Sequence, residues 1–77
     1  MSHQRGKMMP LNMIGAGNSA LVRRISGNDE IRRYLGNLGF VSGAEVSIVS
    51  EIGGNVIVNV KDSRVAINRE MASHILV

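Results

Sequence analysis

Histidines, cysteines and clustered carboxylates are the residues with which proteins most often build catalytic sites, and this chain has few of them. It has no cysteine, which excludes thiolate nucleophiles, thiolate metal ligands and disulfides. Its two histidines are His3, near the start, and His74, near the end. His74 falls in a patterned part of the sequence, but no serine stands in a nucleophile setting beside it. We therefore predict an exposed or a hydrogen-bonded histidine at a strand edge, and no enzyme.

Metal coordination is the second chemistry to consider. Glu70 and His74 are four residues apart, the spacing that aligns two ligands on a helix, but the sequence between them changes from helical to extended character. Asp29, Glu30 and Asp62 have no second histidine nearby. Ligand number and spacing both fall short of zinc and calcium sites. We predict no metal site and no cofactor, and an iron-binding chaperone would lack ligands.

Two pairs of adjacent arginines, Arg23-Arg24 and Arg32-Arg33, offer recognition instead of catalysis. One interpretation is a solvated surface that aids solubility, and a second is a surface for a protein partner. The alternative function is a small basic barrel that binds nucleic acid through these four arginines. Such barrels usually stack bases on aromatic side chains, and only Tyr34 and Phe40 are available. The net charge of +3 also includes Arg5 and Lys7 near the start. We therefore expect no nucleic acid as partner.

The apolar pattern of the first half predicts one strand and one helix. Residues 20–25 form a short run with β-branched character that ends at a turn, which predicts a strand. Ile31, Leu35 and Leu38 recur at i, i+4 and i+7, which predicts a helix over residues 29–38. We expect Asn28 to cap its start and Gly39 to end it in a left-handed conformation, with the next residue folding back onto the last turn.

The second half alternates like an antiparallel sheet. Strands are predicted at 45–52 and 55–60. A two-residue loop between them would place their apolar sets on opposite faces, so we predict a three-residue loop, Gly53-Gly54-Asn55. That loop pairs Ile52 with Val56 and Ile48 with Val60. At the next turn, a two-residue loop at 61–62 pairs Val58 with Val65 and Val56 with Ile67. Residues 68–72 predict a single helical turn, and residues 74–77 a closing strand.

These elements predict a mainly β fold, a small SH3-like barrel of about five strands with one short α-helix inserted between the first and second strands. The predicted core consists of Val46, Ile48, Val56, Val58, Val65 and Ile67 with Ile31, Leu35 and Leu38. Residues 1–8 are expected to be a disordered lead-in, native or derived from expression, and residues 9–77 the barrel domain. No apolar run approaches the roughly 20 residues of a membrane-spanning helix, so we expect no membrane insertion. Residues 1–9 lack the apolar stretch of a secretory signal.

An ordered set of short motifs resembles the FeoA family. It starts at Met9-Pro10-Leu11 and continues through Leu38-Gly39-Phe40 and Gly43-Ala44-Glu45-Val46. The hairpin glycines Gly53-Gly54, then Arg64-Val65-Ala66-Ile67 and Ile75-Leu76-Val77, follow in the same order. Many relatives have proline where this chain has Ser42. The resemblance covers residues 9–77.

The resemblance implies an SH3-like fold, a cytoplasmic location and a role beside FeoB, a membrane ferrous-iron transporter with a cytoplasmic GTPase domain. The expected function is a non-catalytic accessory module that docks on the cytoplasmic part of this transporter and regulates it. Our candidate partner-binding residues are Arg32 and Arg33 on the helix, Arg64 near the tight turn, and the loop residues Phe40, Val41, Ser42 and Gly43. The oligomeric state does not follow from the sequence.

Overall fold

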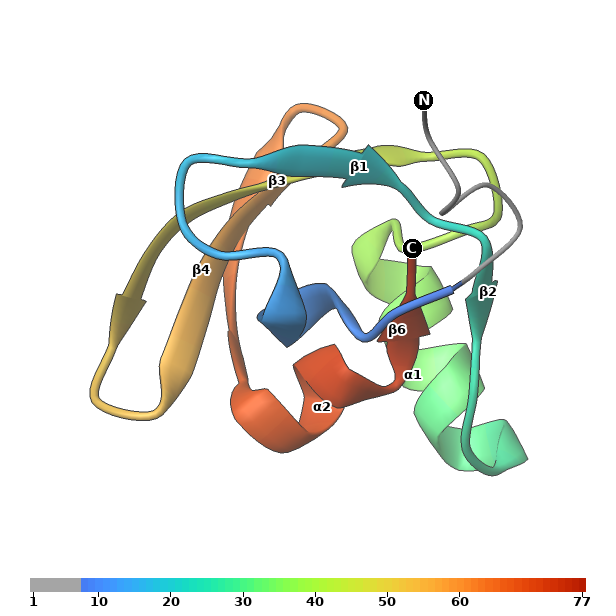
Figure 1. The fold of residues 1–77 in the computed structure, drawn as a ribbon. Helices are drawn as coiled ribbons and strands as arrows, with labels where there is room; N and C mark the ends of the chain where they lie inside the picture. Colours follow the sequence, from blue (N-terminus) through green and yellow to red (C-terminus); the bar gives the residue numbers. More distant parts are fainter. Residues whose placement is uncertain (1–7) are drawn as a thin grey trace.

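The chain folds into two small antiparallel sheets joined by short helices. The computed structural model describes residues 8–77 (Figure 1). A four-stranded sheet has the order β1-β3-β4-β5, with bounds Ser19–Leu21, Glu45–Ile52, Asn55–Val60 and Ser63–Asn68. A second sheet pairs β2 (Arg24–Ile25) with β6 (Ile75–Leu76). A 3-10 helix, η1 (Leu11–Met13), precedes the strands, α1 (Asp29–Leu38) follows β2, and α2 (Arg69–Ser73) connects β5 to β6.

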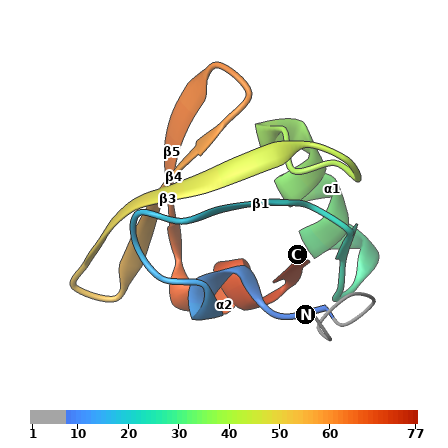
Figure 2. The same cartoon turned by 45° about the horizontal axis from the view of Figure 1, so that its top comes forward.

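This arrangement confirms the predicted mainly β barrel with a helix inserted early in the chain. Six strands and two α-helices occur within residues 8–77, where about five strands and one helix were expected. The two views agree that α1 and α2 lie on the side of the large sheet where the small sheet also lies (Figures 1 and 2). The predicted lead-in falls outside the described residues except for Met8, which is exposed.

The predicted strand over residues 20–25 is wrong as a single element, because the chain passes from one sheet to the other within it. β1 pairs with β3, whereas β2 pairs with β6. At the corner, the Val22 N–H donates to the Ala44 carbonyl at 2.8 Å, and the Arg23 N–H donates to the Leu76 carbonyl at 2.7 Å. The Val22 side chain is buried at this corner. A continuous extended run carries no local mark of a change of partner strand.

The predicted three-residue loop between the second pair of strands is also wrong. The loop is Gly53-Gly54, so that Ile52 pairs with Asn55. Both glycines have positive φ, 52° and 87°, as a tight two-residue hairpin turn of type I′ requires. The apolar faces still coincide because the register shifts between Ile48 and Ser50, where Val49 is an extra residue in β3. This β-bulge corrects the parity that the loop length would otherwise break.

The next hairpin confirms its prediction. β4 and β5 are joined by residues 61–62, Val58 pairs with Val65, and Val56 pairs with Ile67. Lys61 has a φ of 56°, a left-handed conformation that allows the tight turn. The apolar residues of both strands therefore lie on the same face of the sheet.

Helix α1 begins and ends at the predicted residues. The Asn28 side-chain oxygen accepts a hydrogen bond from the Ile31 N–H at 2.9 Å, and Asp29 and Glu30 place negative charge in the first turn. Gly39 has a φ of 110°, and the Phe40 N–H donates to the Leu35 carbonyl at 3.1 Å. This bond belongs to the Schellman motif, in which an apolar residue packs back onto the last turn.

The C-terminal elements are close to prediction. The predicted helical turn over residues 68–72 is α2, one residue later, because Asn68 is its N-cap and accepts from the Met71 N–H at 2.7 Å. The closing strand, β6, pairs antiparallel with β2. Met9 and Val77 exchange two backbone hydrogen bonds of 3.0 and 2.9 Å, which extends the small sheet toward the start of the described chain.

The core contains most of the predicted residues. Val46, Ile48, Val56, Val58, Ile67 and Leu35 are buried, whereas Val65, Ile31 and Leu38 are half-buried and pack against them. Six further buried side chains complete the core: Leu11, Val22, Phe40, Val60, Ala72 and Ile75. Residues from both sheets and both α-helices thus share one apolar interior. Ile52 lies outside it, with 64% of its surface exposed.

Candidate docking surface

The two arginines of the predicted helical surface are exposed on α1. The Arg32 guanidinium lies 3.0 Å from the Asp29 carboxylate, one turn earlier, and both side chains are more than half exposed. Arg33 is exposed as well. An exposed pair of this kind contributes little to stability, so Arg32 can exchange Asp29 for an acidic group of a partner at small cost. We call Arg32 and Arg33 the arginine face.

The candidate loop after α1 divides into buried and exposed parts. The Phe40 side chain is 1% exposed and belongs to the core, so it cannot contact a partner directly. Val41 is 43% exposed. The Ser42 hydroxyl donates to the Arg23 carbonyl at 3.3 Å, and the Gly43 N–H donates to the Val22 carbonyl at 2.8 Å. The loop is therefore held against the corner between β1 and β2, with Val41 as its apolar contact point.

Arg64 belongs to another element, β5, next to the β4–β5 turn. It is exposed, and its Nε donates to the Asn59 side-chain oxygen of the neighbouring strand at 3.2 Å. The alternative nucleic-acid footprint is also divided between elements, because Arg23 and Arg24 lie at and beside the start of β2 while Arg32 and Arg33 lie on α1. The sequence-based candidates thus belong to separate elements of the described chain.

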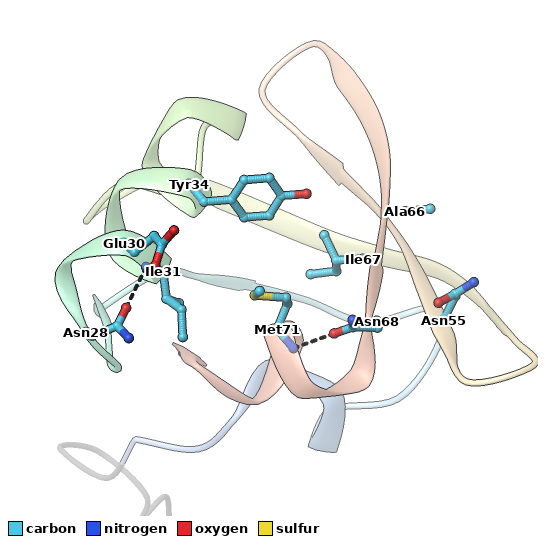
Figure 3. A pocket seen from close by; sticks show the side chains of 9 residues that line it. All are labelled: Asn28, Glu30, Ile31, Tyr34, Asn55, Ala66, Ile67, Asn68 and Met71. Atoms are coloured by element: carbon cyan, nitrogen blue, oxygen red, sulfur yellow. Dashed lines mark hydrogen bonds between the residues drawn. The ribbon is translucent and has the colours of Figure 1, made fainter.

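The structure has a groove between α1 and β5, which the sequence did not reveal. It has a volume of about 630 Å³. Figure 3 shows Tyr34 extending from α1 toward the strand, with Ile31 and Met71 below it. One wall is formed by α1 and its cap, and the other by the strands and α2; the lining residues are Asn28, Glu30, Ile31 and Tyr34, then Asn55, Ala66, Ile67, Asn68 and Met71. We call this feature the α1–β5 groove.

Tyr34 was the sequence signal that could have indicated the groove. It is an aromatic residue at the edge of the stripe of Ile31, Leu35 and Leu38, and it is 48% exposed. An aromatic side chain with about half of its surface exposed is available for contacts in the groove that it lines. Its opposite wall could not be inferred, because the position of α1 relative to β5 depends on how the two sheets enclose the core.

His74 has a structural role. It follows α2 and is half-buried, and its Nδ1 lies 3.1 Å from the Ser26 hydroxyl. The Ser26 N–H donates to the His74 carbonyl at 2.8 Å. These contacts join the turn before α1 to the segment before β6, so His74 adopts the hydrogen-bonded one of its two predicted settings. Glu70 lies in the first turn of α2, before this position.

Metal-ligating residues do not gather in the part of the chain that the structure describes. Within residues 8–77, no group of three or more histidine, cysteine, aspartate or glutamate side chains is placed to hold an ion. The expectation of no metal site remains a prediction that binding measurements must test. No helix among these residues is long and apolar enough to cross a membrane.

Comparison with known proteins identifies the family. The family model described as the FeoA domain matches residues 9–77. The chain belongs to the FeoA family. Members of this family are non-catalytic. No curated protein sequence matches the chain.

Solved structures of FeoA proteins have the same fold. FeoA of Stenotrophomonas maltophilia, crystallised with zinc and described as a procaryotic SH3 domain protein, is 34% identical, covers 87% of this chain and 85% of its own, and has a TM-score of 0.76. An iron uptake regulatory protein, FeoA, is 28% identical over 90% of this chain and 92% of its own, with a TM-score of 0.82. FeoA of Chlorobium tepidum is 29% identical over 87% of this chain and 66% of its own, with a TM-score of 0.79. The SH3-like fold predicted from the sequence is confirmed.

Proposed function

We propose that this protein is a cytoplasmic accessory module of a ferrous-iron uptake system, which docks on the cytoplasmic part of a FeoB-type transporter and regulates it. The observation that carries the proposal is the match of the FeoA domain over residues 9–77. One similar protein is described as a regulator of iron uptake, and another as a candidate activating factor of bacterial ferrous iron transport. A non-catalytic barrel can act in such a system only through what it binds.

The surface of this protein suits a contact with an acidic partner. The arginine face presents two guanidinium groups on one helix, and Val41 provides an exposed apolar side chain in the loop that follows. Positive charge on the docking surface speeds encounter with an acidic patch, while an apolar contact adds burial after encounter. Arg64 adds a third exposed guanidinium on the β4–β5 hairpin.

Charge reversal tests this docking surface. We expect Arg32→Glu with Arg33→Glu to weaken binding to the cytoplasmic domain of the transporter at least tenfold and to slow association, because like charges then meet at the contact. Binding is measured by biolayer interferometry, and iron uptake by complementation of a strain that lacks the chain. Since both side chains are exposed, the free energy of unfolding should change by no more than about 0.5 kcal/mol per site.

A matched control separates position from net charge. Arg23→Glu with Arg24→Glu changes the total charge by the same amount at a different surface, and both residues are exposed. We expect this control to keep most of the affinity. Equal loss in both variants would show a general charge effect, and no loss in either folded variant would refute docking through the arginine face.

A further inference from the structure

The outer edge of β5 carries backbone groups that have no partner within residues 8–77. Val60 and Ser63 flank a two-residue loop, so they form a hydrogen-bonded pair. Bonded and non-bonded pairs alternate along an antiparallel ladder, so Arg64 and Ala66 direct their N–H and C=O groups away from β4. β5 is the last strand of its sheet, and none of these four groups makes a hydrogen bond with the described chain.

The α1–β5 groove lies along this unpaired edge. Ala66 lines the groove, and Ile67 points into it from the same strand (Figure 3). Tyr34 extends from α1 on the far side, and the half-buried Ile31 and Met71 form an apolar floor. An exposed strand edge is usually blocked by charge, proline or a covering element. Here α1 stands beside the edge and leaves a groove with an apolar floor next to Ala66, Ile67 and Asn68.

The polar groups of the groove select the charge of an occupant. Glu30 is the charged residue among those that line it. The side-chain oxygens of Asn28 and Asn68 already accept hydrogen bonds from the Ile31 and Met71 N–H groups, so their amide nitrogens are the groups left to contact a ligand. Charge complementarity to Glu30 favours a basic side chain in the occupant and disfavours an acidic one.

We propose that the α1–β5 groove binds an extended segment of a partner protein, which adds to β5 as a further strand. The segment pairs with the backbone of Arg64 and Ala66, directs alternate apolar side chains toward Tyr34 and the groove floor, and places a lysine or arginine near Glu30. Strand addition takes its affinity from main-chain hydrogen bonds and its specificity from alternate side chains. The proposal rests on the proposed function only for the identity of the partner.

A second copy of this chain fits the edge less well than a single strand. If two β5 edges paired, each copy would bring its own α1 and Tyr34 beside the shared ladder, because α1 forms a wall of the groove along that edge. The two walls would compete for the same space. A lone extended segment of about five residues, some 17 Å long, spans the edge without a wall of its own.

The test uses the full chain and a displayed library of random twelve-residue peptides selected on it. We expect the selected peptides to share alternating apolar residues and a lysine or arginine. In ¹⁵N spectra of the chain, the bound peptide should shift the amide signals of Arg64 and Ala66 and slow their hydrogen exchange. N-methylation of alternate peptide residues should weaken binding at least tenfold for the set that faces β5 and little for the other set.

Protein variants provide a second readout. Ala66→Pro removes the outward N–H at an edge position where proline is tolerated, and should weaken peptide binding about tenfold. Glu30→Gln should weaken it severalfold, most at low salt. Val49→Ala, at an exposed residue outside the groove, is the matched control and should bind normally. If Ala66→Pro does not fold, the N-methyl peptides test the same hydrogen bonds without any change in the protein.

The outcomes separate this proposal from the proposed function. Failure to select any binding peptide, or binding that leaves the Arg64 and Ala66 amides unshifted, overturns strand addition. So does a dimer in sedimentation that Ala66→Pro converts to a monomer, since the occupant is then a second copy. If the transporter's cytoplasmic domain binds the chain but neither competes with the selected peptides nor responds to Ala66→Pro, docking stands and strand addition to that partner fails. If the selected peptides bind as expected but the transporter's cytoplasmic domain does not bind the chain, strand addition stands and docking on the transporter fails.

Discussion

The two hairpins of the large sheet bring the apolar residues of neighbouring strands to one face in different ways. Both use two-residue loops. The β4–β5 hairpin does so with an unbroken register. The β3–β4 hairpin has a loop of the wrong parity for its apolar residues and corrects it with Val49, an extra residue well away from the turn.

The difference shows where a periodicity argument holds. Alternation along 55–60 and 63–68 is regular from end to end, so residues near the turn and residues in the core obey the same parity. In β3, the residues before and after Val49 follow two separate alternations. Ile52, paired with Val56 on the assumption of a single alternation, belongs to the second alternation and is exposed. The extra residue Val49 therefore moves Ile52 off the core face of the sheet.

Deletions give the largest expected contrast between the hairpins. Deletion of Ala66 shifts one half of β5 by a residue, so that either Val65 or Ile67 leaves the core face. We expect a loss of about 3 kcal/mol or more, because each buried aliphatic side chain contributes about 1.5–3 kcal/mol and the ladder is also disturbed. Deletion of Val49 should instead leave a regular β3–β4 ladder with Ile48 and Val58 still paired, at a cost of about 1 kcal/mol.

Urea unfolding followed by circular dichroism measures both deletions. The control is the parent chain under the same conditions, with ¹⁵N spectra to show that the Val49 deletion keeps the fold. An unfolded Val49 deletion would mean that the bulge is required for closure of the barrel, and that its role is more than parity. Equal stability of the two deletions would contradict the register of β4–β5.

Alanine substitutions at a buried residue of β4 and at an exposed residue of β3 test the register of the β3–β4 hairpin. Val58 is fully buried and pairs with Ile48 on one side and Val65 on the other, so Val58→Ala should lower the free energy of unfolding by about 2–3 kcal/mol. Ile52→Ala removes a side chain that is 64% exposed and should change it by less than about 0.5 kcal/mol. In a domain of this size, the first effect lowers Tm by about 8 °C or more.

Thermal unfolding of the two variants therefore decides the register. A large loss at Ile52 would restore the three-residue loop that the sequence favoured, because only that loop places Ile52 opposite Val56 on the core face. A small loss at Val58 would contradict the barrel core itself.

Much of the fold followed from patterns that act locally. The caps of α1, the turn at 61–62, the helical turn at α2 and the closing strand depend on residues close in sequence, and all were predicted. The division of residues 20–25 and the bulge at Val49 depend on which distant segment each residue pairs with. Extended residues look alike in sequence whichever sheet they join, so these features could not be read from the pattern.

The candidate surface divides in the same way. The exposure of Arg32 and Arg33 followed from their position off the apolar stripe of the helix. Phe40 was predicted both to fold back onto the last turn and to bind a partner, and its burial agrees with the first of these only. The α1–β5 groove required the relative positions of a helix and a strand that are about thirty residues apart in sequence. Only the packing of both sheets around one core sets that relation.

Substitutions in the turns themselves extend the comparison of the two hairpins. Gly54 has a φ of 87° with open space around its Cα, so Gly54→Ala meets no steric contact but must adopt a left-handed conformation, at a cost of about 1–2 kcal/mol. Lys61 already adopts such a conformation, with a φ of 56°. Lys61→Gly relieves that strain but adds flexibility to the unfolded chain, which costs about 0.5–1 kcal/mol, so the net change should be a stabilisation below about 1 kcal/mol.

Chemical denaturation of the two variants measures both changes. Gly43→Ala is the control for a left-handed glycine outside a hairpin, because Gly43 has a φ of 90° and also lacks close contacts. Loss of stability in Lys61→Gly would mean that the Lys61 side chain makes a contact worth more than its backbone strain, and that the second hairpin depends on its turn residues as much as the first does.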